Sequence, residues 1–546
     1  MALLAPEFPR VTSRARRSYG GGPWDDRLLD AYLERAVASV PDHKAIIDGD
    51  HELTYRGLHE RVTATAALLR RHGVVKGHVV SFQLPNWWEA FVIHFAAIRI
   101  GAVSNPIMPI MRERELGFML DQAGSRILFV PETHRGFDHR RMAEALQDDL
   151  PRLAHVIAVR GPEDDASSAR QLEAGPSDTH AAERHADDPV LLLFTSGTES
   201  DPKGAVHSHN TLGYEDRSII EHFGLTSADV VFMPSPIAHI TGVLYGFHLA
   251  TFLSSTVVIQ DRWDASVALE TIERERCSFA LAATPFLQGL VDEAERTGRV
   301  TTSLRTFSCG GADVPPHLIR LATERLGCTA ARVYGSTEFP TLCAGRSLDS
   351  LDRRVETDGR LIGAAEVRIT DDDGHPVAVG EVGDVYVRGP EAFLGYLDSA
   401  RTEAAVDADG WFATGDRARM DADGYVTIAG RTKDIIVRGG ENISAKEVED
   451  LIFEHPDVKE VAIVAMSDPV MVEKACAVVV PVPGATVDLD GLVAHLTMKR
   501  IARQKLPERV EIVSELPKTA TGKVQKFRLR EYVAEQIQAE NERASS

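Results

Sequence analysis

The sequence has few cysteines, and they are scattered. Five occur among 546 residues, and no C-x-x-C pair is present. An odd number of widely spaced thiols is typical of reduced cysteines in the cytoplasm, and it disfavours a disulfide framework or a cysteine zinc site. We therefore expect a cytoplasmic protein whose thiols stay reduced.

Long apolar runs and positive charge are also scarce. No segment approaches about 20 uninterrupted apolar residues, so no membrane span is expected. The N-terminal arginines are not followed by an apolar stretch, which disfavours a signal peptide. The formal net charge of −21 repels nucleic acid and anionic membranes, so we expect neither as a partner. A small phosphate ligand remains compatible with this charge, because phosphate sites are built locally from backbone N–H groups and a few cations.

The sequence carries alternating strand and helix patterns. Apolar residues make up 44% and charged residues 26% of the chain, as in ordinary folded proteins, and the length favours several domains. Residues 79–84 predict a strand and residues 88–99 a helix, and the alternation continues, which favours an α/β fold with substantial parallel sheet. Residues 1 to about 25 are expected to be irregular. The pattern changes near residue 430, after which the remaining residues suffice for a compact domain.

A polar segment with two glycines follows the apolar run 190–194. It reads T-S-G-T-E-S-D-P-K-G over residues 195–204. Glycine permits close approach of the backbone to a ligand, the hydroxyls donate hydrogen bonds and Lys203 supplies positive charge, so the segment suits phosphate oxygens. The common P-loop pattern G-x-x-x-x-G-K-[ST] is absent. The alternative is an ordinary polar turn between a strand and a helix.

Four further segments carry side chains suited to nucleotide chemistry. Y-G-S-T-E at 334–338 follows the strand-like residues 331–333. W-F-A-T-G-D at 411–416 ends in an acid that suits ribose hydroxyls. G-R-T-K-D at 430–434 begins the last part of the chain, and P-K-T-A-T-G-K at 517–523 lies near its end.

Other polar clusters are interpreted as structural. His207 and His209 have no carboxylate or cysteine nearby in sequence to complete a metal site, so we expect them to pack or to lie on a helix surface. The acidic runs 371–374 and 421–424 lack the rest of a calcium loop and predict hairpin turns.

Together, the five motif segments resemble the adenylate-forming superfamily of acyl-CoA synthetases, peptide-synthetase adenylation domains and luciferases. The resemblance runs from about residue 25 to about residue 535, with the motifs in the family's order. The family's loop usually reads T-S-G-T-[ST]-G-x-P-K-G, whereas this chain has Glu199 and Ser200, a variant that resembles cyclohexanecarboxylate-CoA ligases. Glu199 places a carboxylate beside a triphosphate site, which costs binding unless it points outward or touches Mg²⁺.

The resemblance implies the domain organisation. It implies a large mixed α/β N-terminal region over 1–430 and a hinge over 431–433, where Lys433 lies. A small, mobile α+β C-terminal domain would cover 434–546.

The resemblance also implies roles for individual residues. Lys523 would bridge the substrate carboxylate and the phosphate during adenylation, Thr337 would contact phosphate, and Glu338 would help to hold Mg²⁺. Gly439 and Gly440 would face the pantetheine arm of coenzyme A. The residues implied in nucleotide binding are Thr195, Ser196, Gly197, Thr198, Lys203, Gly310, Gly311, Ala312, Tyr334, Gly335, Ser336, Asp416 and Arg431.

For the acid, the resemblance implies a pocket that includes His239, Ile240, Thr241, Val333 and Gly335. Family members that activate amino acids place an acid at the position of Ile240, where it pairs with the α-ammonium group. Isoleucine cannot form that pair. The sequence therefore favours an apolar or aromatic acid over an α-amino acid, but it does not identify the acid.

The implied function is activation of a carboxylic acid by ATP and Mg²⁺ to acyl-AMP, followed by transfer to the thiol of coenzyme A. Within the enzyme class, the acceptor could instead be a carrier-protein pantetheine, an amine, or nitrite as in diazotases. The alternative of another class is a catalytically dead, nucleotide-binding regulator. The presence of Lys203, Glu338, Asp416 and Lys523 argues against this last alternative.

Overall fold

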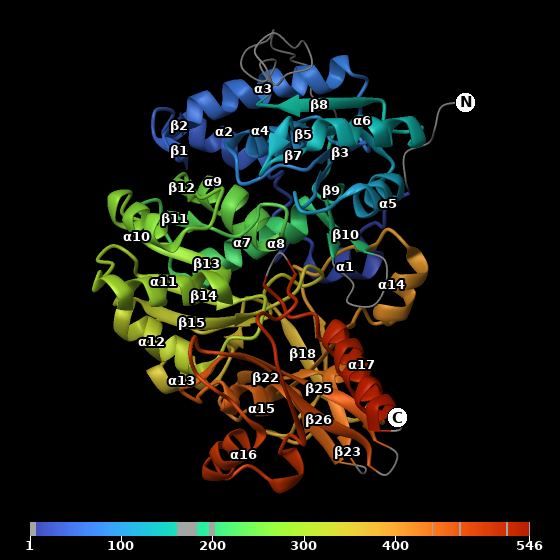
Figure 1. The fold of residues 1–546 in the computed structure, drawn as a ribbon. Coiled ribbons are helices and arrows are strands. Elements are labelled where there is room, and N and C mark those ends of the chain that lie inside the picture. The colour runs from blue at the N-terminus through green and yellow to red at the C-terminus, as the bar shows by residue number, and fades with distance from the viewer. Residues whose placement is uncertain are drawn as a thin grey trace.

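The computed structural model describes residues 7–160, 183–195, 202–438, 441–468, 471–519 and 522–544. Two large sheets and one smaller sheet organise these residues. In Figure 1 most of the N-terminal part, in blue and cyan, lies at the top, the green and yellow part in the middle, and most of the C-terminal part, in orange and red, at the bottom, while the blue helix α1 (Ser13–Tyr19) lies at mid-height beside the orange α14 (Ser399–Ala405). The fold is α/β, with a large N-terminal region and a smaller C-terminal domain, as the sequence predicts.

The largest sheet has thirteen strands within the described ranges. It is parallel from β1 through β12, β11, β13 and β14 to β15, and antiparallel from β15 to β18 and between β1 and β2. The strand order is β18 (Glu366–Thr370), β19 (Gly383–Arg388), β21 (Phe412–Met420), β22 (Tyr425–Arg431), β17 (Gly359–Leu361), β16 (Cys343–Ala344), β15 (Thr329–Tyr334), β14 (Thr306–Gly310), β13 (Phe279–Ala283), β11 (Val230–Met233), β12 (Thr256–Ile259), β1 (Lys44–Asp48) and β2 (His51–Thr54).

The second sheet combines parallel strands with an antiparallel edge. Strands β9, β4, β3, β5 and β8 are parallel, whereas β10 is antiparallel to both β9 and β20. The order is β20 (Gly395–Tyr396), β10 (Lys203–Ser208), β9 (Pro189–Thr195), β4 (Val103–Pro106), β3 (Val79–Phe82), β5 (Ser125–Pro131) and β8 (His155–Val159). A short hairpin of β6 (Thr133–His134) and β7 (Phe137–Asp138) lies apart from both sheets.

Helices of the large region cover these sheets. Helix α4 is buried over residues 89–98, as expected for a helix that is apolar around its whole circumference. In the described part of the chain, no helix is both long and apolar enough to cross a membrane. The helices of this region are α1 (Ser13–Tyr19), α2 (Asp30–Ser39), α3 (Tyr55–Arg71), α4 (Trp88–Arg99), α5 (Glu113–Ala123), α6 (His139–Asp149), α7 (His209–Phe223), α8 (Ile240–Gly242), the π-helix η2 (Val243–His248), α9 (Leu249–Leu253), α10 (Ala265–Arg274), α11 (Thr284–Thr297), α12 (Pro316–Leu326), α13 (Leu351–Glu356) and α14 (Ser399–Ala405).

The residues from 435 onward, called the C-terminal domain below, build their own sheet and core. The apolar runs 461–465 and 475–480 lie in the two strands of a long antiparallel hairpin. Alternating side chains of this hairpin pack against α15 and α16 on one face and α17 on the other. The elements are β23 (Ile435–Arg438), β24 (Glu441–Ser444), α15 (Ala445–Ile452), β25 (Val458–Asp468), β26 (Val472–Pro481), α16 (Leu489–Met498), the short 3₁₀ turn η4 (Arg503–Lys505), β27 (Arg509–Ile512) and α17 (Lys526–Ala544). Another 3₁₀ turn, η3 (Thr432–Asp434), directly precedes this domain.

The N-terminal arm, defined here as residues 7–24, is more ordered than the sequence predicts. It contains α1, so the prediction of an irregular segment is wrong there. The Trp24 indole N–H donates to the carbonyl oxygen of Pro390 at 2.9 Å, and Pro9 and Arg14 lie against Gly395 and Gly410. The arm is therefore held by residues almost 400 positions later in the chain.

Candidate active site

A cavity of about 1740 Å³ lies between the large region and the C-terminal domain. The carboxyl ends of the parallel strands β14 and β15 open onto it, which is where α/β sheets usually bind ligands. Every predicted site residue within the described ranges lines this cavity: Thr195, Lys203, His239, Ile240, Thr241, Gly310, Gly311, Ala312, Val333, Tyr334, Gly335, Ser336, Thr337, Glu338, Asp416, Arg431, Lys433 and Lys523. The predicted residues Ser196, Gly197, Thr198, Gly439 and Gly440 lie outside the described residues.

Thr195 and Lys203 are the described ends of the predicted phosphate loop. They are paired in the antiparallel ladder of β9 and β10, so the loop joins two strands of one hairpin. The alternative of a strand-to-helix turn is wrong, because helix α7 begins only after β10. The Lys203 ammonium lies 5.4 Å from the centre of the Tyr396 ring, within the range of a cation–π contact.

The Glu338 carboxylate is held beside this lysine by the same tyrosine. The Tyr396 hydroxyl donates to Glu338 Oε1 at 2.7 Å, and strand β20 pairs directly with β10. Burial, together with the nearby charge of Glu338, raises the pKa of Tyr396, so its hydroxyl stays neutral and remains a donor. Glu338 and Lys203 therefore share Tyr396 as a contact, and both line the cavity.

Thr337 is positioned by a buried histidine of β10. The His207 Nε2 lies 2.8 Å from the Thr337 carbonyl oxygen, so this nitrogen must carry the proton. Burial lowers the pKa of His207 to about 4, which keeps the ring neutral. The sequence suggested a packing or surface role for this histidine, and the contact links the strand after the predicted phosphate loop to the Y-G-S-T-E segment.

Two predicted glycines permit close backbone approach at the ends of β14 and β15. A Cβ at Gly310 would lie 2.2 Å from the Val333 carbonyl oxygen, and one at Gly335 would lie 1.8 Å from the Pro340 carbonyl oxygen. Any side chain at either position would therefore displace the backbone. The two glycines therefore let the ends of β14 and β15, which line the cavity, pack directly against neighbouring backbone.

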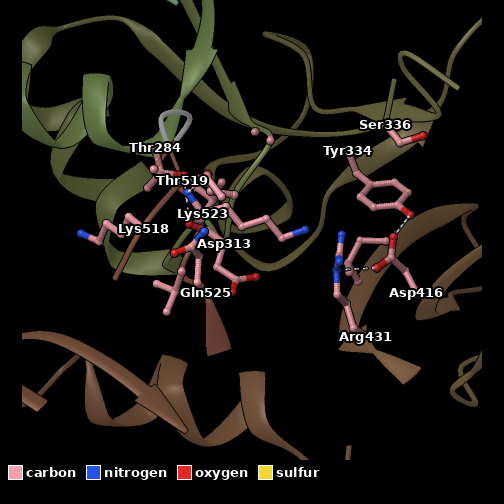
Figure 2. Close-up of a pocket in the computed structure, with 18 of the residues that line it drawn as sticks. Thr284, Asp313, Tyr334, Ser336, Asp416, Arg431, Lys518, Thr519, Lys523 and Gln525 are labelled. Carbon is pink, nitrogen blue, oxygen red and sulfur yellow. Dashed lines mark hydrogen bonds and ion pairs between the residues drawn. The ribbon is translucent and has the colours of Figure 1, made fainter. Parts of the chain in front are cut away.

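Asp416 is held between a phenol and a guanidinium group (Figure 2). The Tyr334 hydroxyl donates to Asp416 Oδ2 at 2.5 Å, and Arg431 Nε lies 3.4 Å from Asp416 Oδ1. Asp416 and Arg431 are cross-strand neighbours in β21 and β22, which explains their proximity. Burial, reinforced by the charge of Asp416, raises the pKa of Tyr334, so the phenol remains a donor.

Lys523 enters the cavity from a tight turn of the C-terminal domain. The turn is closed by the Thr519 N–H, which donates to the Lys523 carbonyl oxygen at 2.8 Å, and by a bridge between Lys518 and Val524. Burial, with help from the positive charge of Arg431, lowers the pKa of Lys523 to about 8, although Asp416 opposes this shift. Lys523 therefore lies within electrostatic reach of the predicted ribose acid.

His239 and Ile240 line another part of the same cavity. Burial, and then the positive charge of Lys523, lower the pKa of His239 to about 4, so the ring is neutral. Ile240 is buried, and the segment Ser235–Gly242 contains no carboxylate. Leu281 and Val333 add further apolar wall.

A buried polar network behind this wall was not predicted from the sequence. The Tyr245 hydroxyl donates to Glu215 Oε1 at 2.7 Å and lies 2.5 Å from Thr341 Oγ1. Tyr245 and Thr341 line the cavity, and burial raises the pKa of Glu215 to about 7. These residues come from α7, η2 and the loop after β15, so no local sequence pattern connects them.

The donor set fits a nucleotide with one magnesium ion better than a metal site made by protein alone. Among the described residues, no group of three or more metal-binding side chains occurs. Magnesium with a nucleotide commonly needs only one or two carboxylates, because phosphate oxygens and water supply the remaining ligands. Glu338, which lines the cavity and shares Tyr396 as a contact with Lys203, meets that requirement.

Comparison with known proteins gives relatives along nearly the whole chain. The medium-chain fatty-acid–CoA ligase of Escherichia coli (strain K12) is 36% identical over 522 residues, which covers 94% of this chain and 92% of the relative. A salicylyl-CoA synthase / salicylate adenylyltransferase of Streptomyces sp. is 34% identical over 538 residues, covering 96% and 97%.

A solved structure of a CoA ligase has the same fold over nearly the whole chain. The anthranilate CoA ligase in complex with anthranoyl-AMP superposes with a TM-score of 0.87 at 26% identity, covering 94% of this chain and 98% of that one. Residues 33–397 match the AMP-binding enzyme family, and residues 447–523 match the AMP-binding enzyme C-terminal domain. The resemblance read from the motifs is confirmed, and the chain belongs to the family of AMP-binding enzymes.

Proposed function

We propose that this chain uses ATP to convert a carboxylic acid into acyl-AMP, with release of pyrophosphate, and then transfers the acyl group to the thiol of coenzyme A. The observation that carries the proposal is that Lys523 lines one cavity with Lys203, Glu338, Asp416 and Arg431, and that the charges of the last two act on it. The names of the Escherichia coli and Streptomyces relatives, which are CoA-forming enzymes for a fatty acid and an aromatic acid, support it.

The chemistry explains why these groups are needed. A carboxylate is a poor acyl donor, because its leaving group would be oxide. Attack of a carboxylate oxygen on the α-phosphorus of ATP breaks the bond to pyrophosphate and forms a mixed anhydride with AMP. A thiolate then attacks the acyl carbon and expels AMP, a good leaving group, while the thiol proton passes to solvent.

In the first step two anions must meet, so positive charge must be arranged before the reaction begins. We assign this task to Lys523, between the carboxylate and the α-phosphate, and to Lys203 and Thr337 at the triphosphate. Glu338 would hold Mg²⁺, which supplies charge neutralisation to the phosphates when bound. Asp416, oriented by Tyr334, would accept hydrogen bonds from the ribose hydroxyls, assisted by Arg431.

The wall formed by Gly310, Gly311 and Ala312 would receive the adenine ring, with Tyr334, Gly335 and Ser336 opposite. Thr195, Ser196, Gly197 and Thr198 complete the proposed triphosphate loop with Lys203. His239, Ile240, Thr241, Val333 and Gly335 would surround the acid.

The second step requires different contacts, and we propose that the C-terminal domain rotates to supply them. The proposed hinge is 431–433, with Lys433 as its pivot, between a region of residues 1–430 and a domain of residues 434–546. After rotation, Gly439 and Gly440 would face the pantetheine arm. Because ATP and a reduced CoA thiol are needed together, we propose a cytoplasmic location.

The experiment that tests the function measures pyrophosphate release from ATP with a panel of acids: octanoate, benzoate, salicylate and 3-phenylpropionate. Release with at least one acid, followed by a CoA thioester when CoA is added, is the expected result. Acyl-AMP that accumulates with CoA but reacts with a carrier protein, an amine or nitrite would reassign the acceptor. Binding of ATP without release, for every acid, would favour the regulator.

Ile240 gives a prediction about the substrate. Burying an unpaired ammonium beside an isoleucine costs several kcal/mol, whereas an apolar chain gains roughly 25 cal/mol per Å² of area buried. We expect 3-phenylpropionate to be activated faster than phenylalanine, its α-amino analogue, in the pyrophosphate assay. Faster release with phenylalanine would show that the pocket has been misread. An aromatic amine is not affected by this argument, because it is largely uncharged at neutral pH.

The lowered pKa of Lys523 predicts a pH profile. Because the ammonium form is the one that neutralises charge, kcat/KM for ATP in pyrophosphate release should fall as the pH rises through about 8. The matched control is Lys523→Arg, whose side chain stays charged, so its residual activity should lack this limb. A wild-type profile that stays flat to pH 9 would contradict the assignment.

A further inference from the structure

Asp313 brings a carboxylate of the large region to a group of lysines on the C-terminal domain. It follows the Gly310–Ala312 segment, and its Oδ1 lies 3.8 Å from the ammonium of Lys446 on α15. The positive charges of Lys526 and Lys523 also act on it. Figure 2 shows Asp313 beside the turn that carries Thr519 and Lys523.

These cations keep Asp313 ionised. Burial alone would raise its pKa, but Lys446 and the other nearby cations outweigh burial, and the pKa is lowered. Asp313 lines the cavity, and 63% of its side chain remains accessible, so water screens the attraction in part. The contact is therefore a moderate attraction between the two halves of the site.

Lys446 and Lys526 each also have a carboxylate partner within the C-terminal domain, while Asp358 and Asp416 of the large region act electrostatically on Lys446 and Lys523. Lys446 lies 3.1 Å from Asp450, and Lys526 lies 2.7 Å from Glu449. Those pairs move with the domain in any rotation, so they do not favour one orientation over another. The contact with Asp313 crosses between the two parts and is lost when the domain turns away.

Two further contacts hold Asp313 and the turn before Lys523 against the start of α11. A Cβ on Gly522 would lie 2.4 Å from Pro285 Cγ, so the turn before Lys523 packs closely on the start of α11. The Thr284 hydroxyl donates to the Asp313 carbonyl oxygen at 2.9 Å, which ties the Asp313 backbone to that helix. Asp313 therefore acts directly beside the turn that carries Lys523 into the cavity.

We propose that Asp313 is a positioning residue, which holds the C-terminal domain in the orientation that places Lys523 in the cavity. The inference rests on the proposed function, since only the adenylation step needs Lys523 there. An interaction made in one of two orientations shifts their populations by its own free energy, and coupling of this kind is typically worth about 5- to 150-fold. Asp313 thus favours acyl-AMP formation without touching the reacting atoms.

The test is Asp313→Asn, which removes the charge but keeps the backbone carbonyl that accepts from Thr284. We expect pyrophosphate release with the four panel acids to slow by about tenfold, in the lower part of the usual coupling range. Thioester formation from the corresponding synthetic acyl-AMP and CoA should be unchanged or faster. Asp313→Glu should recover most of the first rate, because it restores the charge.

The matched control is Asp352→Asn, which removes the partner of Arg320 (2.8 Å) in an exposed ion pair within the large region. This variant should leave both half-reactions unchanged. Equal losses in both half-reactions of Asp313→Asn, or no loss in either, would overturn the proposal.

A distance measurement separates this proposal from the proposed function. All five native cysteines are buried, so spin labels can be attached to cysteines introduced at Glu324 on α12 and Met498 on α16. Asp313→Asn should broaden the distance distribution between the labels, and an unchanged distribution would overturn the positioning role. Wild-type protein that releases no pyrophosphate with any acid would instead count against the function, while the distances still decide the role of Asp313.

Discussion

Replacing Lys523 with alanine is expected to slow acyl-AMP formation by two to three orders of magnitude. The ammonium is the charge that we place between the attacking carboxylate and the α-phosphate, and it already lies within reach of Asp416 and Arg431. A well-placed electrostatic contact of this kind is typically worth about 3–4 kcal/mol in the transition state. Pyrophosphate release under single-turnover conditions measures the effect.

The diagnostic feature is the difference between half-reactions. Thioester formation from synthetic acyl-AMP and CoA should stay within a few-fold of wild type, because that step does not use Lys523. The matched control is Lys518→Ala, in the same turn, since Lys518 pairs with Glu460 at 2.7 Å inside the C-terminal domain. Comparable losses in both half-reactions, or an equal loss in the control, would contradict the role of Lys523.

The second large effect is expected for Asp416→Ala, which should weaken ATP binding. The ribose hydroxyls would lose a charged acceptor, and hydrogen bonds to charged groups contribute about 1.5–3 kcal/mol each. We expect the Kd for ATP, measured by isothermal titration calorimetry, to rise roughly 10- to 100-fold. The variant also leaves the Tyr334 hydroxyl and the Arg431 guanidinium without their shared partner.

Two comparisons separate the ribose contact from this local disruption. Asp416→Asn keeps an acceptor oxygen without the charge and should give an intermediate Kd. Tyr334→Phe removes the hydroxyl that orients Asp416 but leaves the carboxylate, so its effect should be smaller than that of Asp416→Ala. An ATP affinity that is unchanged in Asp416→Ala would remove this residue from the proposed site.

Much of the fold could be predicted because the sequence of each element indicates its structure locally. The apolar run at 190–194 lies within β9, and the helix predicted at 88–99 coincides with α4. The acidic run at 421–424 forms the turn between β21 and β22, as predicted. In each case the signal lies within a few residues, so neighbouring side chains decide the structure.

The remaining features depend on contacts between distant segments. Nothing near Lys203 indicated that β10 would run back along β9, because the short segment 204–208 has no pattern that fixes the direction of a strand. Tyr396 reaches Glu338 only because β20 pairs with β10. Asp313 interacts with lysines more than 100 residues later in the chain, and no local sequence pattern predicts such a contact.

A chain of contacts connects the N-terminal arm to the cavity. Pro9 packs on Gly395, next to Tyr396, and Tyr396 contacts both Glu338 and Lys203. The family match begins at residue 33, so the arm lies outside it. A protease cut, a fused tag or a natural variant in residues 7–24 would therefore act on the cavity wall around Tyr396, where we propose that the triphosphate binds, although none of these residues lines the cavity.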